Sequence, residues 1–276
     1  MSVEVIFTKG FGNNLFQYVF GRLLAEHHKI PLYHTQIYNQ PQSNPKYRNG
    51  IVDIKTQWNM SNEESNKSYR ELFNKSAHYR LKDYFEDYTL YIPHEEKIKS
   101  WFPKITITNY KDLVVHFRAG DALLYKNNLI NFPSSEEWNK VISSIPHQNL
   151  YVVTDCVYRY SVNEQQIKTW VDDICKKRGY TNRQKFLGDQ EAMGIVNSYI
   201  DLFNEHNCIW IHSDDYMNDF NFLRKFNKVV AGPSTFSWWA LFLSDAKEKY
   251  IYRSWRKGKG IRNKNLGQVP EWNGWG

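Results

Sequence analysis

Residues 228–240 read KVVAGPSTFSWWA, an apolar run that passes through a Gly-Pro step into hydroxyl side chains and a pair of tryptophans. The run Lys228–Gly232 predicts a buried strand, and the stretch that begins at Pro233 predicts the start of a helix. Further apolar runs of strand length lie at 113–117, 150–155, 208–212 and 249–253. Segments of helical composition lie between them, and strands that alternate with helices predict a parallel sheet with right-handed crossovers. The expected fold class is therefore α/β.

The chain opens with a second unit of strand, loop and helix. Residues 3–7 are a short apolar run, the loop at 10–14 reads GFGNN, and apolar side chains then recur at helical spacing. Asn13 or Asn14 is suited to cap that helix. Apolar periodicity of this kind indicates a helix with one face turned toward a core.

A change of composition separates the two units. Residues 36–66 are dominated by Gln, Asn, Ser and Pro, which predicts a long surface loop, and residues 67–110 are expected to hold helices. The second alternation starts near residue 111. We therefore expect two domains, residues 1–110 and residues 111–276.

Composition limits the classes of protein. With 276 residues and 41% hydrophobic side chains, the chain can build a core, and wholesale disorder is not expected. No apolar stretch approaches the ~20 residues of a membrane helix, and the three cysteines include no Cys-x-x-Cys. These features predict a reduced, cytoplasmic protein that is soluble or peripheral to a membrane.

The charge balance favours anionic partners. The formal net charge is +7, and six basic side chains surround Trp255 between Arg253 and Lys264. This C-terminal tail could contact phosphate, glycan or lipid headgroups, which allows a peripheral membrane contact, or it could simply be solvated. Elsewhere the basic residues are scattered, so no nucleic-acid partner is expected.

Polar clusters fall where the predicted strands end. They are Gly10–Asn14, His116–Asp121, Thr154-Asp155 and Ser234–Ser237. Ligands of open parallel sheets bind outside the carboxyl ends of the strands, so these clusters define a candidate site. Gly10 and Gly12 allow a close backbone approach, although the loop lacks the third glycine of a dinucleotide fingerprint and could be only a tight turn.

Two of these clusters suit a diphosphate. The guanidinium of Arg118 can bind phosphate oxygens in a bidentate manner, with Asp121 orienting it or capping the next helix; a structural Arg–Asp pair is the alternative. The hydroxyls of Ser234 and Thr235 with helix N-terminal amides form a phosphate cradle, or one of them is an N-cap. No Asp-x-Asp and no His-Glu-x-x-His occurs, so no metal site is expected.

Three motifs resemble those of the α-1,2-fucosyltransferases, glycosyltransferase family 11 of the fucosyltransferase superfamily. GFGNNLFQY at 10–18 is similar to the family's Gly-x-Gly-Asn-Gln-Leu/Met-Phe-Gln-Tyr opening. HFRAGD at 116–121 is similar to His-x-Arg-Arg-Gly-Asp, and STFSWWA at 234–240 to Ser-Thr-Phe-Ser-Trp-Trp-Ala/Gly. The motifs occur in the family's order and span most of the chain.

The resemblance implies a GT-B-type architecture, in which two Rossmann-like α/β domains face a cleft. The N-terminal domain would lie on the acceptor side, and the C-terminal domain would bind the nucleotide sugar. The implied reaction is inverting, metal-independent transfer of a deoxyhexose in glycan biosynthesis. The donor would be a GDP-sugar, most often GDP-L-fucose, and the acceptor a hydroxyl of a glycan or oligosaccharide, with an α-1,2 linkage. No cofactor is implied.

The resemblance also implies roles for individual residues. Arg118 would grip the pyrophosphate, and Ser234, Thr235 and the amide of Phe236 would complete the phosphate site. His116 and Asp219 would read guanine, whose N1–H and N2–H₂ donors match a carboxylate and are absent from uracil. Gly10, Gly12, Asn13 and Asn14 would form the donor-side loop. Asp121 is the first candidate for the general base, with a carboxylate near the amino-terminal loop as its rival.

Three departures from the family pattern bear on the donor sugar. Asn14 stands where the family has Gln, Ala119 replaces the second Arg, and Pro233 stands where Asn often precedes Ser-Thr-Phe. Another GDP-deoxyhexose such as GDP-rhamnose therefore stays open as the donor. So does a catalytically inactive, GT-B-like glycan-binding protein.

Overall fold

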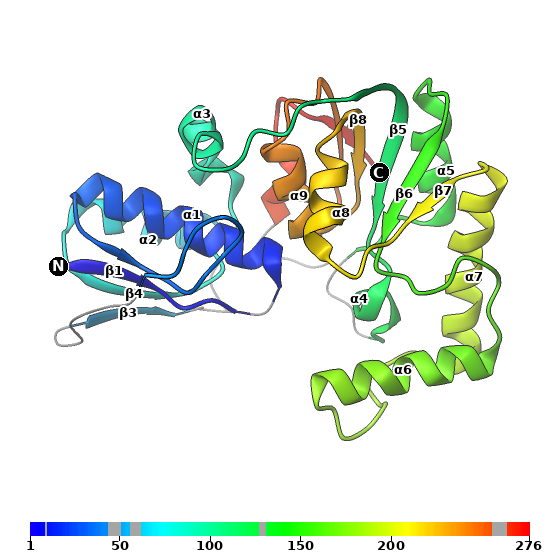
Figure 1. Cartoon of the computed structure of the whole chain (residues 1–276). Coiled ribbons are helices and arrows are strands. Elements are labelled where there is room, and N and C mark those ends of the chain that lie inside the picture. Colours follow the sequence, from blue (N-terminus) through cyan, green and yellow to red (C-terminus); the bar gives the residue numbers. More distant parts are fainter. Residues whose placement is uncertain (9, 44–50, 56–61, 127–130, 256–263) are drawn as a thin grey trace.

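The computed structural model describes the chain except residues 9, 44–50, 56–61, 127–130 and 256–263 (Figure 1). Its strands form a four-stranded sheet in the order β2-β1-β4-β3 and a six-stranded sheet in the order β10-β9-β8-β5-β6-β7. The described strand pairs of both sheets are parallel. The expected α/β class with parallel sheets is confirmed.

The first sheet comes from the N-terminal part of the chain. Its strands are β1 (Ser2–Val5), β2 (Leu32–Tyr33), β3 (Ile51–Lys55) and β4 (His78–Lys82). The helices of this part are α1 (Phe11–His28), α2 (Asn62–Glu71) and α3 (Glu95–Lys99), with short 3-10 helices at Leu72–Asn74, Tyr88–Leu90 and Ile92–His94. The prediction of a loop over residues 36–66 is wrong, because this segment contains β3 and the start of α2.

The second sheet comes from the rest of the chain. Its strands are β5 (Asn109–Phe117), β6 (Leu150–Thr154), β7 (Ile209–Ile211), β8 (Phe226–Ala231), β9 (Glu248–Tyr252) and β10 (Asn273–Trp275). The helices are α4 (Gly120–Leu124), α5 (Ser135–Ser144), α6 (Glu164–Arg178), α7 (Asp189–Glu205), α8 (Tyr216–Leu223) and α9 (Thr235–Phe242), followed by a 3-10 helix at Lys264–Gln268. The predicted domain boundary at residues 110–111 falls near the start of β5.

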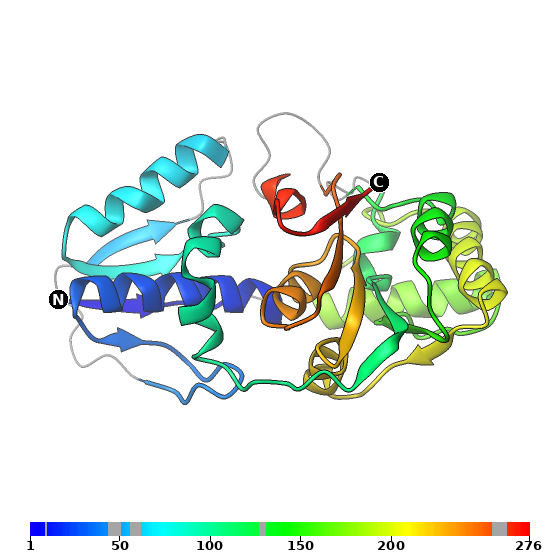
Figure 2. The same ribbon diagram turned by 90° about the horizontal axis from the view of Figure 1, so that it is seen from above.

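Helix α1 packs against α9 between the two sheets (Figure 2). The ring of Phe16 on α1 lies 4.9 Å from the rings of both Trp238 and Trp239 on α9, and both tryptophans are fully buried. These tryptophans therefore belong to the core. Aromatic packing of this kind holds the N-terminal end of α1 beside the carboxyl end of the second sheet.

The basic tail is described only in part. The guanidinium of Arg253 donates to the backbone carbonyls of Gly267, Val269 and Trp272, and Trp255 is buried. These two residues are therefore structural. Residues 256–263, which carry most of the tail's charge, lie outside the described residues, so the expected membrane contact stays a prediction.

Candidate functional site

The glycine loop lies directly against the start of α9. A Cβ added to Gly12 would lie 2.4 Å from the carbonyl carbon of Thr235 and 2.5 Å from the amide nitrogen of Phe236, so this approach requires glycine. The hydroxyl of Thr235 donates to Asn13 Oδ1 over 2.7 Å, which joins residues 222 positions apart. The first and third sequence motifs therefore form one contact.

Helix α1 starts earlier than the sequence predicts. Gly10 precedes the helix with a φ of 98°, a left-handed conformation that favours glycine, and Phe11 is the first helical residue. Asn13 and Asn14 lie inside the first turn, and neither caps the helix. The prediction of an Asn cap is wrong, and Asn13 instead accepts from α9.

The second motif reaches the same place through the sheet. Strand β5 pairs with β8, so that His116 lies opposite Ala231, and the amide of Gly232 donates to the carbonyl of His116 over 3.4 Å. The ring of His116 lies 5.2 Å from that of Phe236. Strand pairing thus sets His116 beside Gly232, two residues before Ser234, and Arg118 follows His116 by two residues.

Phe236 is the residue at which the predicted segments meet. Its ring lies 6.1 Å from Phe11 in the glycine loop and 5.3 Å from Phe220 on α8, the neighbour of Asp219. Phe11 and Phe220 lie 5.1 Å apart. Four segments that are distant in sequence therefore converge around one aromatic cluster, formed by Phe11, His116, Phe220 and Phe236.

Three predicted donor-site residues carry buried polar atoms without a hydrogen-bond partner in the described part of the chain. These atoms are Asn14 Oδ1, His116 Nδ1 and Asp219 Oδ1. The other carboxylate oxygen of Asp219 accepts only a long hydrogen bond, 3.4 Å, from the amide of Ser213. A buried polar atom without a partner is costly, and a ligand that supplies the partner removes this cost.

Burial sets the charge of two of these groups. Burial lowers the pKa of His116 to about 4; the positive charge of Arg118 acts against protonation and the carboxylate of Asp155 favours it. His116 is therefore a neutral imidazole at neutral pH. Burial raises the pKa of Asp219, against the amide of Ser213 and the nearby His212, which lower it.

Arg118 is half-buried, and among the described residues its guanidinium has no hydrogen-bond or ion-pair partner. Asp121 lies on α4, but its side chain is outside the described part of the structure. The expected pairing of Asp121 with Arg118 and its expected role as base therefore stay predictions. A permanently charged guanidinium without a described partner is suited to bind an anion.

The start of α9 supplies neutral donors. Ser234 precedes the helix with extended backbone and is buried, but its side chain makes no capping hydrogen bond, so the capping alternative is wrong for this residue. The first backbone N–H groups of a helix have no partner within the helix and can bind an anion. The amide of Phe236 belongs to this first turn.

Sequence reasoning placed Asp155 in the candidate site without a role and did not identify Tyr38. Asp155, which follows β6, accepts hydrogen bonds from the amides of Ala119 and Gly120. Tyr38, with a φ of 51°, reaches across from the N-terminal part: its hydroxyl donates to Asn221 Oδ1 over 2.8 Å and accepts from Arg224 over 3.0 Å. The strand end at Asp155 was visible in the sequence, but nothing in residues 36–66 marks Tyr38.

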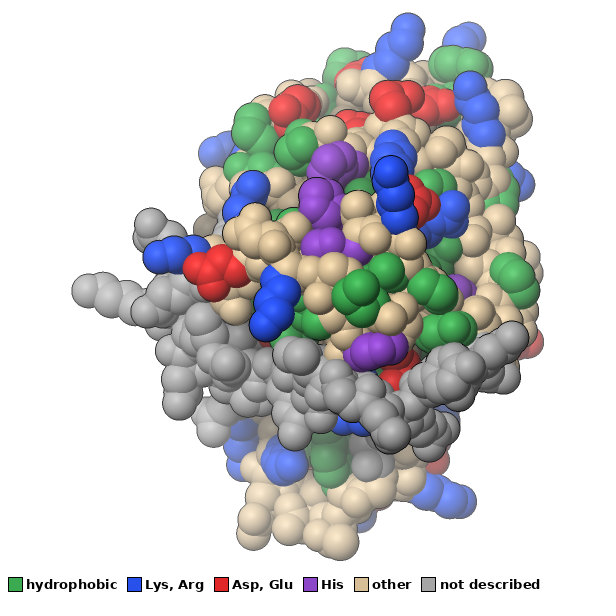
Figure 3. Space-filling view, turned by 90° about the vertical axis from the view of Figure 1, so that its left-hand side faces the viewer, with side chains coloured by type: hydrophobic (Ala, Val, Ile, Leu, Met, Phe, Trp, Pro, Cys, Tyr) green, Lys and Arg blue, Asp and Glu red, His purple; other side chains and the backbone are tan. Residues whose placement is uncertain are grey.

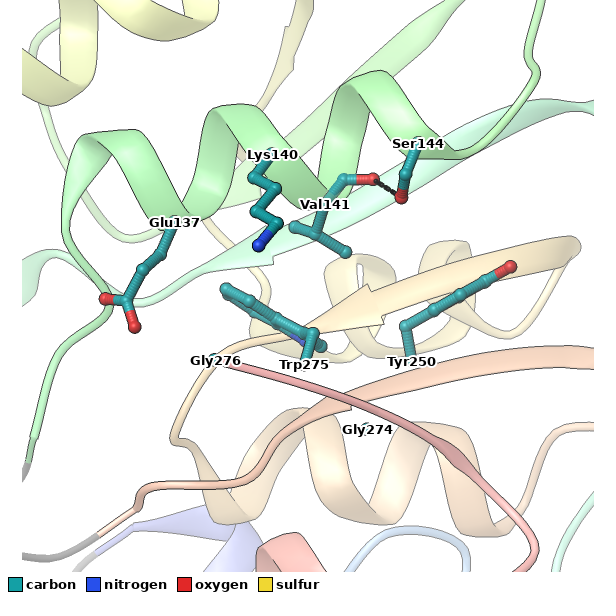
Figure 4. Close-up of a pocket in the computed structure, with 8 residues that line it drawn as sticks. All are labelled: Glu137, Lys140, Val141, Ser144, Tyr250, Gly274, Trp275 and Gly276. Carbon is teal, nitrogen blue, oxygen red and sulfur yellow. Dashed lines mark hydrogen bonds between the residues drawn. The ribbon is translucent and has the colours of Figure 1, made fainter.

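A separate cavity of about 430 Å³ lies between α5 and the strands β9 and β10 (Figure 4). Lys140 on α5 points toward Trp275, and Tyr250 forms part of the opposite wall. None of the predicted site residues lines this cavity. It does not contribute to the site around Phe236.

Histidine side chains gather on the side of the molecule that carries the N-terminus (Figure 3). Nε2 of His27 donates to the carbonyl of Phe73 and Nε2 of His28 to that of Leu72, each over 2.9 Å. Within the described ranges, no three His, Cys, Asp or Glu side chains are arranged to hold a metal ion. His27 and His28 both bind backbone carbonyls of the 3-10 helix Leu72–Asn74.

No helix among the described residues is long and apolar enough to cross a membrane. Comparisons with protein-family models, with curated proteins and with solved structures gave no match.

Proposed function

We propose that the chain is an inverting, metal-independent glycosyltransferase of GT-B type. It would move a deoxyhexose, L-fucose from GDP-L-fucose in the first instance, to a hydroxyl of a glycan acceptor. The observation that carries the proposal is the convergence around Phe236. A cation and three buried polar atoms that have no partner among the described residues, together with a helix N-terminus, all belong to segments that meet there.

The phosphate chemistry follows from the donors at this point. When the bond from the sugar to the diphosphate breaks, negative charge develops on GDP. Arg118 supplies a full positive charge, and the first-turn amides of α9 supply fixed dipoles, while the hydroxyl of Thr235 donates to Asn13 Oδ1 and holds the glycine loop beside them. Preorganised donors stabilise the leaving group without reorganisation at the moment of reaction, which lowers the barrier.

Base recognition follows from the unpartnered atoms of Asp219 and His116. The carboxylate of Asp219 matches the N1–H and N2–H₂ donors of guanine. Its raised pKa reflects burial, and two ligand donors would lower that pKa by stabilising the charged form. Because uracil lacks this pair of donors, the site would discriminate GDP from UDP.

The test is a transfer assay with a panel of nucleotide sugars, including GDP-fucose, GDP-rhamnose and UDP-sugars. We expect turnover with a GDP-deoxyhexose and a loss of about 100-fold or more in Arg118→Ala, with the thermal stability of the fold retained. The matched control is Arg70→Ala, because Arg70 is exposed and its contacts with described residues are two long hydrogen bonds, 3.4 and 3.5 Å, to Thr89.

The outcomes separate the alternatives. Turnover with GDP-rhamnose alone would keep the reaction and correct the donor. Glycan binding without turnover or donor hydrolysis would favour the inactive, GT-B-like binding protein. Turnover in Arg118→Ala equal to that of Arg70→Ala would remove Arg118 from the mechanism.

A further inference from the structure

Asp155 holds the backbone turn that carries Arg118. Strands β5 and β6 pair in parallel with Phe117 opposite Thr154, so the next residues, Arg118 and Asp155, leave the sheet side by side. Asp155 Oδ1 accepts from the amide of Ala119 over 2.7 Å and from the amide of Gly120 over 2.8 Å. Hydrogen bonds to a carboxylate are stronger than those between neutral groups.

The contact with Asp155 requires that residue 120 has no side chain. A Cβ added to Gly120 would lie 2.3 Å from Asp155 Oδ2 and 3.0 Å from its carboxyl carbon. Ala119 precedes α4 and has no side chain that could cap the helix. The carboxylate from the neighbouring strand therefore takes the place of a local cap.

The contact fixes the backbone on both sides of Arg118. On one side, Phe117 belongs to β5; on the other, the next two amides are bound to Asp155. The guanidinium itself has no partner among the described residues, so its direction depends on this backbone. The negative charge of Asp155 also reaches the site, because it raises the pKa of His116 against the effect of burial.

We propose that Asp155 is a positioning residue, which orients Arg118 toward the phosphates by binding the amides of Ala119 and Gly120. The inference rests on the proposed function. Asp155 acts here as an acceptor and neither gives nor takes a proton. A residue misplaced by about 1 Å can cost up to a hundredfold in a site of this kind, so the effect is measurable.

The experiment compares Asp155→Ala, Asp155→Asn and the control Asp214→Ala by calorimetric GDP binding and by transfer kinetics. The Asn variant keeps an acceptor oxygen for both amides but not the charge. Asp214 is an exposed carboxylate at the same edge of the sheet, after β7, and no described hydrogen bond involves it. We expect the Kd for GDP to rise about 10-fold or more in Asp155→Ala, and to stay within about threefold in the other two.

Coupling to Arg118 distinguishes positioning from general stability. If Asp155 acts through Arg118, then Asp155→Ala should cost less than about twofold in GDP affinity when Arg118 is already Ala. Equal costs in both backgrounds would overturn the inference. So would a loss of turnover in Asp155→Asn with unchanged GDP affinity, because that result assigns a proton-transfer role.

The two proposals fail differently. A wild-type protein that binds no GDP refutes the proposed function and, with it, the phosphate contact of Arg118. A wild-type protein that binds GDP, together with an Asp155→Ala variant that binds it equally well, refutes only the role of Asp155.

Discussion

Gly12→Ala tests the contact between the glycine loop and α9. The new Cβ would lie 2.4, 2.5 and 2.7 Å from three backbone atoms of Thr235 and Phe236, none of which can rotate away. Carbon atoms pack at about 3.5 Å or more, so α1 and the turn must separate by about 1 Å. Overpacking of this kind costs about 1–3 kcal/mol.

The matched control is Gly194→Ala in the middle of α7. An added Cβ at Gly194 meets nothing within 4 Å, so this variant should gain only the helix propensity of alanine, about 1 kcal/mol. At Gly12, the second residue of α1, this gain is no larger. The difference in the free energy of unfolding between the two variants is therefore at least the overpacking cost, which corresponds to roughly 2–12 °C in Tm.

Thermal unfolding and GDP titration of both variants measure the effect. We expect Gly12→Ala to melt below Gly194→Ala and to bind GDP about 10- to 100-fold more weakly, because the Thr235 hydroxyl and the Phe236 amide move with the turn. Equal melting temperatures for the two variants would refute the close contact. A destabilised Gly12→Ala that binds GDP normally would refute its place in the donor site.

His116→Asn tests the neutral imidazole. The pKa of His116 in the fold, about 4, lies below the unfolded value of 6.5. The unfolded state therefore binds more protons than the folded state between pH 6.5 and 4. As pH drops through that window, the free energy of unfolding of the wild type should fall by about 3 kcal/mol relative to that of the variant. Urea unfolding that gives the same pH dependence for both proteins would contradict this. Asp219→Asn should weaken the binding of GDP about 10-fold or more and leave the binding of UDP unchanged. An equal effect on both nucleotides would contradict the recognition of guanine by Asp219. Tyr38→Phe should cost about 1–3 kcal/mol of unfolding free energy because it leaves buried Arg224 short of a partner, whereas Tyr160→Phe, at an 82% exposed position, should cost nothing measurable.

The residues of the site that follow directly after strands could be predicted from the sequence. Buried parallel strands are continuous apolar runs, so the positions of His116 and Gly232 follow from the sequence pattern, and their proximity follows from the pairing of β5 with β8. Ser234 and Thr235 follow in the same way from the start of α9. The pattern could not give the order of strands, because that depends on long-range packing.

Local conformation and tertiary contacts decided the rest. The start of α1 depends on the left-handed backbone at Gly10 and on the approach of Gly12 to α9, which override the capping preference of Asn. Strands β3 and β4 are five residues each and lack the continuous apolar run that marks the buried strands of the second sheet, so they were not predicted. Asp155 binds backbone amides, and such acceptors leave no mark on the residues that they contact.

Calorimetric titration of the wild-type protein with GDP and with UDP tests the central claim most directly. The account predicts that GDP binds at least about tenfold more tightly, because both nucleotides offer a diphosphate to Arg118 and the start of α9 but only guanine offers donors to Asp219. Equal affinities, or no binding of either nucleotide, would contradict it.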